Sequence, residues 1–401
     1  MWGTHMPGPM QGYKIIDLSQ IVSGPLATML LADQGADVIK VEQADSIGDM
    51  TRLPSFASGG IAALYANNNR GKKSIALDLT TDTGRSILCE LVAEADVVVQ
   101  NFRPGAVERL GIAYDNLVAV RPDLVYCSIS GFGPTGPYAE QPVLDPVIQG
   151  IAGVIGRQCN PADGRPDLVR NLFADKSTAL TVAQAITAAL LVRERTGDGQ
   201  HIEVPMLDAC VWFHWPDGMM DHTMLDDPTP GVLLAEIYTL TDAADGQFVY
   251  IATNNTMRHS LYRAVGHPEW CDDPRFSTME AAMVPENFRA IDALLRDVFR
   301  TLPLADILHR LRAADVPCGP ILSPGEVIDD PQIVHNGTLE TWVDPVAGRV
   351  RQPRPAARFS RTPAAVAASL SAKGADTDAI LAALGHGPDD IARFRADGVV
   401  S

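Results

Sequence analysis

The chain has 401 residues, of which 46% are apolar and 20% are charged, and its formal net charge is −17. This composition is that of an ordinary globular protein with enough chain for two or three domains. The acidic balance argues against a general binder of nucleic acid or of membrane surfaces, although a phosphorylated ligand would need only a local basic cluster.

Taken in chain order, the first 130 residues alternate short apolar strands with helices. Strands are expected at residues 13–18, 36–41, 74–79, 95–99 and 124–130, with helices at 23–34 and 81–94. This alternation implies parallel strands joined by helical crossovers, and therefore a Rossmann-like sheet. The G-x-G-x-x-G fingerprint is absent, so NAD binding is not supported. The loops after residues 99 and 130 fall at the carboxyl ends of strands, where open α/β sheets bind ligands.

Basic residues concentrate at strand ends and in loops of this first part, despite the acidic total. They are Lys40, Arg70, Lys72, Lys73, Arg103 and Arg109. Two interpretations stay open: a solvated surface, or a site for the phosphates of a nucleotide-like ligand.

The segment 171–209 begins with Asp175 and continues into a long apolar helix. The helical spacing places Asp175 at or near the helix start, where the helix dipole and free N–H groups favour a carboxylate. The local pattern leaves open whether Asp175 is an N-cap or a catalytic group. Asp145 poses the same question, because it precedes Pro146 and could simply cap a helix.

The remaining chain predicts a smaller α+β domain and a tail. After a strand at 201–204 and a helix from 205, residues 217–231 read as a linker. A hairpin is expected at 236–240 and 248–253, helices at 256–265, 286–300 and 304–313, a strand or turn at 316–320, and a last helix at 376–384.

Cysteines and histidines indicate no metal site and no disulfide framework. The six cysteines include no C-x-x-C pair, and the nine histidines have no partner at ligand spacing. We expect reduced, mostly buried thiols in a cytoplasmic protein. The longest apolar stretch, residues 179–192, is too short and too mixed to span a bilayer. G-x-S-x-G and the P-loop are also absent, which leaves carboxylate chemistry at Asp175 and Asp145.

Several long segments, in order, resemble the family III CoA-transferases, which include formyl-CoA and carnitine CoA-transferases and α-methylacyl-CoA racemases. The similar segments are SGPLATMLLADQGADVIKVE, NNNRGKKSIALDL, ADVVVQNFRPGAVERLG, SISGFGPTGP, the block from ADKSTAL to RERTGDGQHIEVPMLDA, and VPCGPILSPGEVIDDPQ. They cover nearly the whole chain, so the resemblance is far more specific than a single short motif.

The resemblance implies an interlocked homodimer in which each subunit threads through the other. It also implies a large Rossmann-like CoA-binding domain at 1–216, a small α+β domain at 217–330, and a C-terminal segment at 331–401 that returns to the large domain. The substrates would be an acyl-CoA and a carboxylic acid, with no permanently bound cofactor. The family nucleophile falls on Asp175, which would attack the thioester to give a mixed anhydride and then an aspartyl-CoA thioester. In this view the helix start keeps Asp175 ionised, and its amides stabilise the oxyanion.

The resemblance also assigns binding residues. Asp145 matches an acidic position beside the reacting centre that could orient the acyl group. Lys40 matches a basic position that meets the CoA phosphates, and Leu77 and Leu79 would border the adenine. The remaining matches lie around the nucleotide and are Val22, Ser23, Asn101, Phe102 and Arg109.

Two departures from the family pattern bear on activity. The racemases carry a histidine immediately before the acidic position, where this chain has Leu144, and leucine cannot transfer a proton. The glycine-rich loop that shields intermediates in the formyl-CoA enzyme has no clear counterpart, since 228–234 contains one glycine. A CoA-transferase is therefore the leading hypothesis. An acyl-CoA racemase or isomerase using Asp175 as a base, and a non-catalytic acyl-CoA-binding protein, are the alternatives. The aromatic run 212–215 is expected to be core rather than an acyl pocket.

Overall fold

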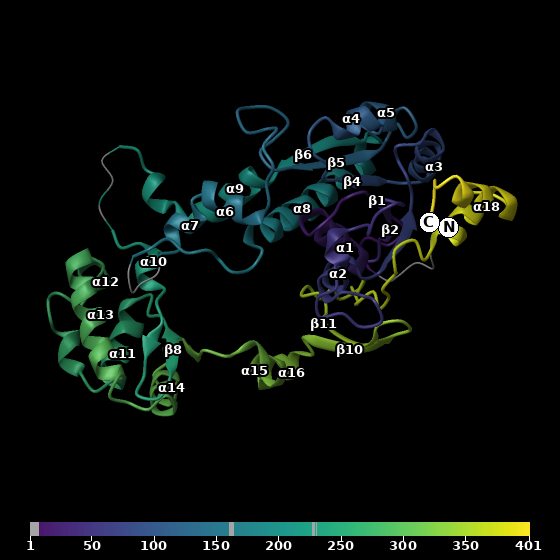
Figure 1. Cartoon of the computed structure of the whole chain (residues 1–401). Helices are drawn as coiled ribbons and strands as arrows, with labels where there is room; N and C mark the ends of the chain where they lie inside the picture. The colour runs from purple at the N-terminus through teal and green to yellow at the C-terminus, as the bar shows by residue number, and fades with distance from the viewer. Residues whose placement is uncertain (1–7, 160–163, 227–228, 230) are drawn as a thin grey trace. The chain divides into compact units, whose positions relative to one another are not determined.

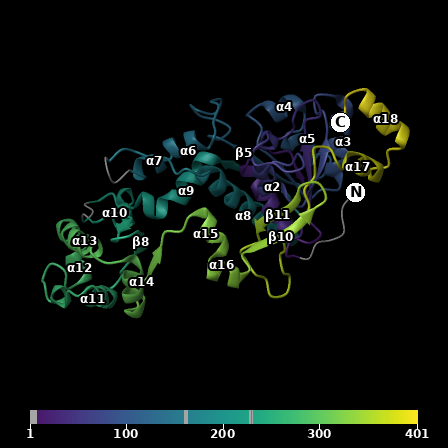
Figure 2. The same cartoon turned by 60° about the horizontal axis from the view of Figure 1, so that its bottom comes forward.

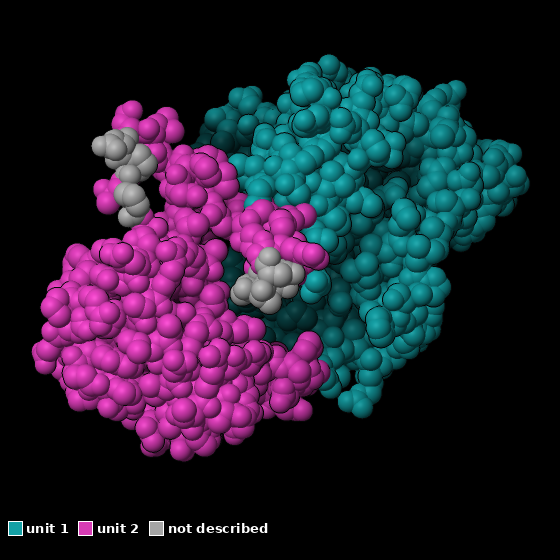
Figure 3. All heavy atoms as spheres, turned by 60° about the vertical axis from the view of Figure 1, so that its left-hand side comes forward, with its two compact units in different colours: residues 1–153, 168–213, 331–401 teal, residues 154–167, 214–330 magenta. Residues whose placement is uncertain are grey.

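The computed structural model describes residues 8–159, 164–226, 229 and 231–401. The chain divides into two compact units, coloured separately in Figure 3. Unit 1 comprises the chain up to Gly153 together with Leu168–Phe213 and Pro331–Ser401. Unit 2 comprises Val154–Asp167 and His214–Asp330. The domain limits expected from the sequence stay predictions, and the first residues of the 228–234 segment lie partly outside the described part of the chain.

Within its described residues, unit 1 is built on a sheet of six parallel strands. The strands are β1 (Lys14–Asp17), β2 (Asp37–Glu42), β3 (Lys72–Ala76), β4 (Val97–Gln100), β5 (Val125–Ser130) and β6 (Gln200–Pro205). Their order, β3-β2-β1-β4-β5-β6, is the order typical of Rossmann-type sheets. Central strands such as β4 are continuous apolar runs because helices cover both of their faces. The predicted parallel α/β sheet is confirmed.

Helices of unit 1 follow the strands, so that their N-termini lie at the carboxyl edge of the sheet (Figure 1). They include α1 (Ser23–Asp33), α2 (Ala63–Asn69), α3 (Asp82–Ala93), α4 (Ala106–Leu110), α5 (Tyr114–Val118), α6 (Asp145–Ile151) and α8 (Phe173–Thr196), with a 3-10 turn, η1, at Met50–Arg52. Thr81 caps α3 by accepting the N–H of Gly84 at 3.0 Å. Helix α9 (Met206–Gly218) follows β6 and continues into unit 2.

The topological switch point of the sheet lies between β1 and β4, which pair in parallel. Chain crossovers leave this point in opposite directions, so the loops after the two strands meet at the carboxyl edge. The contact is direct: the side chain of Asn101, after β4, bonds both backbone groups of Gln20, after β1, at 2.8 and 2.7 Å. The fold therefore brings the segments that resemble CoA-binding loops to one place.

The C-terminal segment packs onto unit 1 along β3. Asp376 accepts the N–H of Ser74 at 2.8 Å, and Leu77 pairs with Val400 in an isolated bridge. Helices α17 (Thr377–Ala383) and α18 (Pro388–Ala396) complete a core with α3, and α18 lies beside α3 in both Figure 1 and Figure 2. The last predicted helix is confirmed.

A hairpin of β10 (Leu339–Asp344) and β11 (Gly348–Pro353) covers α2 (Figure 2). Gln352 donates to the carbonyl of Ala66 at 2.9 Å. Neither this hairpin nor α18 is predicted from the sequence.

Unit 2 contains an antiparallel sheet of β7 (Thr241–Asp242), β8 (Gln247–Tyr250) and β9 (Cys318–Pro320). Its other elements are α7 (Val154–Arg157), η2 (Met220–His222), α10 (Leu234–Ile237), α11 (Asn255–Ala264), η3 (Pro268–Cys271), α12 (Met279–Ala282), α13 (Pro285–Phe299), α14 (Leu304–Ala313) and α15 (Pro324–Asp329), and α16 (Pro331–Asn336) follows in unit 1. The helices predicted at 256–265, 286–300 and 304–313 are confirmed. They pack around Phe248, Tyr262 and Phe299.

The strand predicted at 236–240 is wrong, because its first residues form the short helix α10. Glu236 accepts the N–H of Leu233 at 3.4 Å, a capping contact that favours a helical turn, and it also pairs with Arg289 at 3.0 Å. The hairpin itself exists, but its first strand is β7. Among the described residues, none of the helices combines the length and apolarity needed to cross a membrane.

Candidate functional site

Asp175 lies in the first turn of α8 and is 7% exposed. The N-cap of this helix is Leu172, which makes no side-chain capping bond, and Asp175 is the third helical residue. The prediction that Asp175 sits near a helix start is confirmed, but α8 is buried along one face only, and the simple N-cap interpretation is wrong. Its carboxylate is therefore not occupied in capping its own helix.

Asp145 supplies the missing cap from another helix. It is the first residue of α6, after an N-cap at Leu144, so its own N-cap interpretation is also wrong. Its Oδ2 accepts the backbone N–H of Asp175 at 2.9 Å. One of the unpaired N–H groups at the start of α8 is thus satisfied by a buried carboxylate 30 residues away. The amide of Asp175 is consequently engaged and is not free for an oxyanion.

Gln149 holds Asp145 in place, although it was not predicted from the sequence. Its Nε2 donates to Oδ1 of Asp145 at 2.6 Å and to the carbonyls of Val169 at 3.2 Å and Asn171 at 3.3 Å. Its Oε1 accepts the N–H of Val169 at 3.1 Å. The i, i+4 spacing from Asp145 on a helix was the one signal in the sequence that could have found it.

The acidity of Asp175 reflects its enclosure. Burial and, after it, the negative charge of Asp145 raise the pKa of Asp175 to about 6, although a hydrogen bond from the backbone N–H of Ser23 acts to lower it. The expectation that the helix start keeps Asp175 ionised is therefore corrected, because the pKa of this carboxyl is raised rather than lowered. With this pKa, about nine-tenths of the carboxyl groups are ionised at pH 7.

The start of α1 forms the opposite wall of the site. Val22 is the N-cap of α1 and Ser23 its first residue, and both are buried. The N–H of Ser23 acts on the carboxylate of Asp175. The resemblance assigned these two residues to the CoA nucleotide, and the structure places Ser23 beside the candidate nucleophile. The first residue of α1 thus donates its N–H to the carboxylate of Asp175, an arrangement that favours negative charge there.

Cys210 is a buried thiol of α9 that is affected by the charge of Asp145. Burial and, after it, this charge raise the pKa of the thiol to about 11, although a hydrogen bond involving Ser177 acts to lower it. The thiol is therefore protonated at neutral pH and is a poor nucleophile. Asp175 is the better nucleophile of the two.

Three of the basic residues noted in the sequence form ion pairs with buried aspartates inside unit 1. Lys40 is 0% exposed and pairs with Asp49 at 3.0 Å, Lys72 pairs with Asp17 at 2.8 Å, and Arg70 pairs with Asp33 at 2.6 Å. A phosphate could reach the ammonium of Lys40 only if the surrounding chain moved, so its predicted phosphate contact is not realised in this conformation. Arg103 and Arg109 are exposed.

The other predicted CoA contacts fall into two groups. Asn101 and Phe102 are half-buried at the switch point, and exposed Arg109 follows them in α4. Arg109 lines a cavity of about 830 Å³ together with the loop of residues 134–142. Leu77 and Leu79 are instead buried in the core shared with α3 and α18. The first group is accessible to a ligand, whereas Leu77 and Leu79 are core residues whose predicted contact with adenine is not available in this conformation.

The aromatic run after β6 is not the core that the sequence analysis expects. Trp212 is 73% exposed, and Phe213 and Trp215 are also exposed, whereas His214 is buried. Phe213 packs edge-on against Phe173 with ring centroids 5.5 Å apart, and Phe173 is two residues from Asp175. Within the described residues, no group of three His, Cys, Asp or Glu side chains is arranged to hold a metal ion.

Known proteins resemble this chain over nearly its full length. The sequence profile of CoA-transferase family III matches residues 10–377. The acetyl-CoA:oxalate CoA-transferase of Acetobacter aceti is 35% identical over 342 residues, which are 83% of this chain and 85% of that protein. The succinate–glutarate CoA-transferase of Agrobacterium fabrum is 34% identical over 354 residues, which are 83% of this chain and 86% of that protein. The crystal structure of a CAIB/BAIF family protein from Brucella suis, 34% identical, has a TM-score of 0.79 and covers 94% of this chain and 100% of that one.

Proposed function

The chain belongs to CoA-transferase family III and is a CoA-transferase, and on that premise we propose that Asp175 is the nucleophile that carries CoA between two carboxylic acids. The observation that carries this proposal is the setting of Asp175. It is a buried carboxylate with a pKa of about 6, whose own backbone N–H is held by Asp145 and whose carboxylate accepts the N–H of Ser23.

The first half of the reaction exchanges the acyl group for CoA on the enzyme. The ionised Asp175 attacks the thioester carbonyl, and collapse of the tetrahedral intermediate forms a mixed anhydride and releases CoA thiolate. The thiolate then attacks the aspartyl carbonyl, which gives an aspartyl-CoA thioester and frees the donor acid. No general base is needed, because the nucleophile is already an anion at neutral pH.

The second half reverses these steps with another acid. The acceptor carboxylate attacks the aspartyl-CoA carbonyl, releasing thiolate and forming a second anhydride, and the thiolate returns to the acyl carbonyl and regenerates Asp175. The negative oxygen of each tetrahedral intermediate on Asp175 develops where the Ser23 amide lies. A donor placed in advance in this way stabilises the intermediate more than the ground state.

We assign the CoA nucleotide to the carboxyl edge of unit 1. Asn101, Phe102 and the cavity bordered by Arg109 lie at the topological switch point, where this class of sheet binds its ligands. The guanidinium of Arg109 is exposed and suited to bind a phosphate. For the acids, the relatives named for oxalate and for glutarate favour a short dicarboxylic acid as a substrate.

An acyl-CoA racemase is the second candidate, because a carboxyl pKa near neutrality also suits a general base. The residue before Asp145 argues against it. Leu144 is 59% exposed, and it carries no group that could take or give the second proton. Exchange of α-protons of 2-methylacyl-CoA into deuterated water, without CoA transfer, would favour the racemase.

We also infer an interlocked homodimer in the cytoplasm. Unit 1 leaves large apolar side chains exposed on α8 and α9, among them Leu180, Leu191, Trp212 and Phe213, and a second subunit would cover them. The six cysteines are all free thiols, as in a reducing compartment. Sedimentation equilibrium should give twice the chain mass of 43.0 kDa, and a monomer at micromolar concentration would contradict this inference.

The proposal is tested by Asp175→Ala, compared with Asp198→Ala at an exposed position just beyond the other end of α8. Acetyl-, formyl- and succinyl-CoA are each offered with oxalate and with glutarate, and CoA binding is measured by calorimetry. Asp175→Ala should keep CoA binding and lose transfer, while Asp198→Ala should keep both. Transfer that survives in Asp175→Ala would show that another group is the nucleophile.

A further inference from the structure

The turn between β1 and α1, residues 19–22, contains a backbone conformation that its sequence does not favour. Ile21 has a φ of 72°, in the left-handed region, although it is not glycine. A β-branched residue is strongly disfavoured there, so the surrounding structure must hold it. Such strain is found where precise geometry matters, and Ile21 lies two residues before Ser23.

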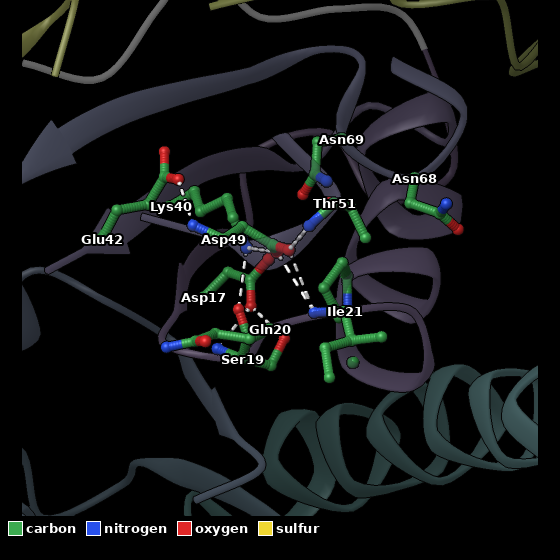
Figure 4. A network of polar contacts seen from close by, with 12 residues as sticks. Asp17, Ser19, Gln20, Ile21, Lys40, Glu42, Asp49, Thr51, Asn68 and Asn69 are labelled. Carbon is green, nitrogen blue, oxygen red and sulfur yellow. Dashed lines mark hydrogen bonds and ion pairs between the residues drawn. The ribbon is translucent and has the colours of Figure 1, made fainter. Parts of the chain in front are cut away.

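Asp49 holds the strained residue directly. Both of its carboxylate oxygens accept the N–H of Ile21, each at 3.2 Å. The same carboxylate accepts the N–H of Thr51 at 2.9 Å and its hydroxyl at 2.8 Å, and pairs with the ammonium of Lys40 at 3.0 Å. Figure 4 shows the Asp49 carboxylate among Lys40, Thr51 and the backbone of Ile21. Asp49 is completely buried, and although burial raises its pKa, Lys40 and Thr51 together hold the pKa below its ordinary value.

The neighbouring residues of the turn are held by other buried groups. Lys40 donates to the carbonyl of Ser19 at 2.7 Å, and Asp17 accepts the N–H of Ser19 at 2.9 Å. Asn101 bonds both backbone groups of Gln20. The turn is thus fixed at three successive residues by side chains from β1, β2 and two loops.

The conformation of residues 19–22 sets the direction of the first backbone N–H of α1. Gly24 allows the start of α1 to pack closely against Ser19, because a Cβ at this position would lie 2.2 Å from Oγ of Ser19. The helix consequently begins two residues after the strained Ile21, with the N–H of Ser23 donated to the carboxylate of Asp175. A change in the Ile21 backbone would redirect that N–H.

We propose that Asp49, paired with Lys40, is a positioning residue for CoA transfer: it holds the Ile21 turn so that the Ser23 amide meets the Asp175 carboxylate and the oxyanion that forms on it. The inference rests on the proposed role of Asp175. It gives a role to the fully buried pair of Lys40 and Asp49, which lies beside the buried pair of Lys72 and Asp17. It also gives Lys40 a function other than phosphate binding.

Asp49→Asn tests the proposal with little change of shape. Every group that contacts the Asp49 carboxylate donates a hydrogen bond to it. In the asparagine variant the NH₂ group would face one of these donors, so at least one hydrogen bond to residue 49 is lost. Displacing one oxyanion donor should lower kcat on the order of a hundredfold, with a smaller change in KM for acyl-CoA. Because the Ser23 N–H stabilises ionised Asp175, its loss should also move the acid limb of the rate–pH profile upward by about one pH unit.

The matched control is Asp33→Asn, which breaks the buried pair with Arg70 in the same unit without touching the turn. Asp33→Asn should lose about as much thermal stability as Asp49→Asn, but the acid limb of its rate–pH profile should stay where it is in the wild type. Adding Ile21→Gly to Asp49→Asn should restore activity, because glycine adopts a positive φ without a clamp. If Asp49→Asn does not fold, Thr51→Val removes a single bond to Asp49 and should shift the acid limb in the same direction by less.

Rates are measured with the acyl-CoA and acid that the wild-type protein uses fastest among acetyl-, formyl- and succinyl-CoA with oxalate and glutarate. In parallel, hydroxylamine capture at Asp175 is followed by mass spectrometry. An upward shift of the acid limb, with rescue by glycine, supports the proposal. A folded Asp49→Asn whose Asp175 is still captured with an unchanged acid limb overturns it while leaving the nucleophile assignment intact. Absence of capture in the wild type would instead refute the role of Asp175 itself.

Discussion

At the scale of single residues, the site depends on how two buried carboxylates share a small space. Asp145 accepts the amide of Asp175 at 2.9 Å, and its charge acts on the Asp175 carboxylate, so the same residue orders the helix start and raises the nucleophile's pKa. A carboxylate with a higher pKa is a better nucleophile when ionised, and a value of about 6 keeps it ionised at neutral pH. The helical pattern placed Asp175 near a helix start, and the resemblance to the family identified it as the candidate nucleophile. The acidity of Asp175 could not be predicted from the sequence, because Asp145 and Ser23 reach it only through the fold.

The raised pKa of Asp175 has a consequence for stability. When the folded pKa lies above the unfolded one, the unfolded chain loses its proton first, so stability falls as pH rises from about 4 and levels off above about 6. Asp175→Asn removes the cost of keeping a buried carboxylate ionised, and it should therefore raise the free energy of unfolding by about 3 kcal/mol at pH 7.5. The gain should shrink to about half at pH 5 and vanish near pH 3. Urea unfolding at the three pH values measures it, and a gain independent of pH would contradict the assigned acidity.

At the scale of elements, the N-termini of α1 and α8 converge at the carboxyl edge of the sheet. The apolar runs of β1, β2, β4 and β5 made the parallel sheet predictable, because strands buried on both faces have an unmistakable pattern. The hairpin of β10 and β11 was not predictable in this way. Its strands carry exposed charges such as Glu340, Arg349 and Arg351, and only one face packs on α2.

Gly24 tests the placement of α1. In Gly24→Ala the new methyl group would lie 2.2 Å from Oγ and 2.3 Å from Cβ of Ser19, so the helix start must shift. We expect a loss of about 1–3 kcal/mol in the free energy of unfolding, together with a fall in kcat. Gly156→Ala in α7 is the control, since a Cβ there meets nothing within 4 Å and should be neutral or slightly stabilising. Equal behaviour of the two variants in urea unfolding and transfer assays would contradict the described packing.

At the scale of the whole molecule, the chain leaves unit 1 and returns to it. Residues 331–401 close the edge of β3 and fill the core beside α3, so the large unit is assembled from segments at both ends of the sequence. Sequence patterns identified the last helix but not its partner, since a non-local contact leaves no periodic signal. The order of the strands in the sheet could not be predicted from sequence patterns either. This order places Asn101 against Gln20 and creates the topological switch point.

If Asp175 is the nucleophile, it becomes covalently linked to acyl and CoA groups during transfer. Mass spectrometry of the whole protein and its peptides, after incubation with the preferred acyl-CoA and hydroxylamine, detects this link. We expect a hydroxamate on Asp175, formed at the expense of the anhydride or the aspartyl-CoA thioester. It should be absent without acyl-CoA, and the free acid released should match the label in amount. Transfer that proceeds with Asp175 unmodified, or with the label on another residue, would contradict the assignment of Asp175 as the nucleophile.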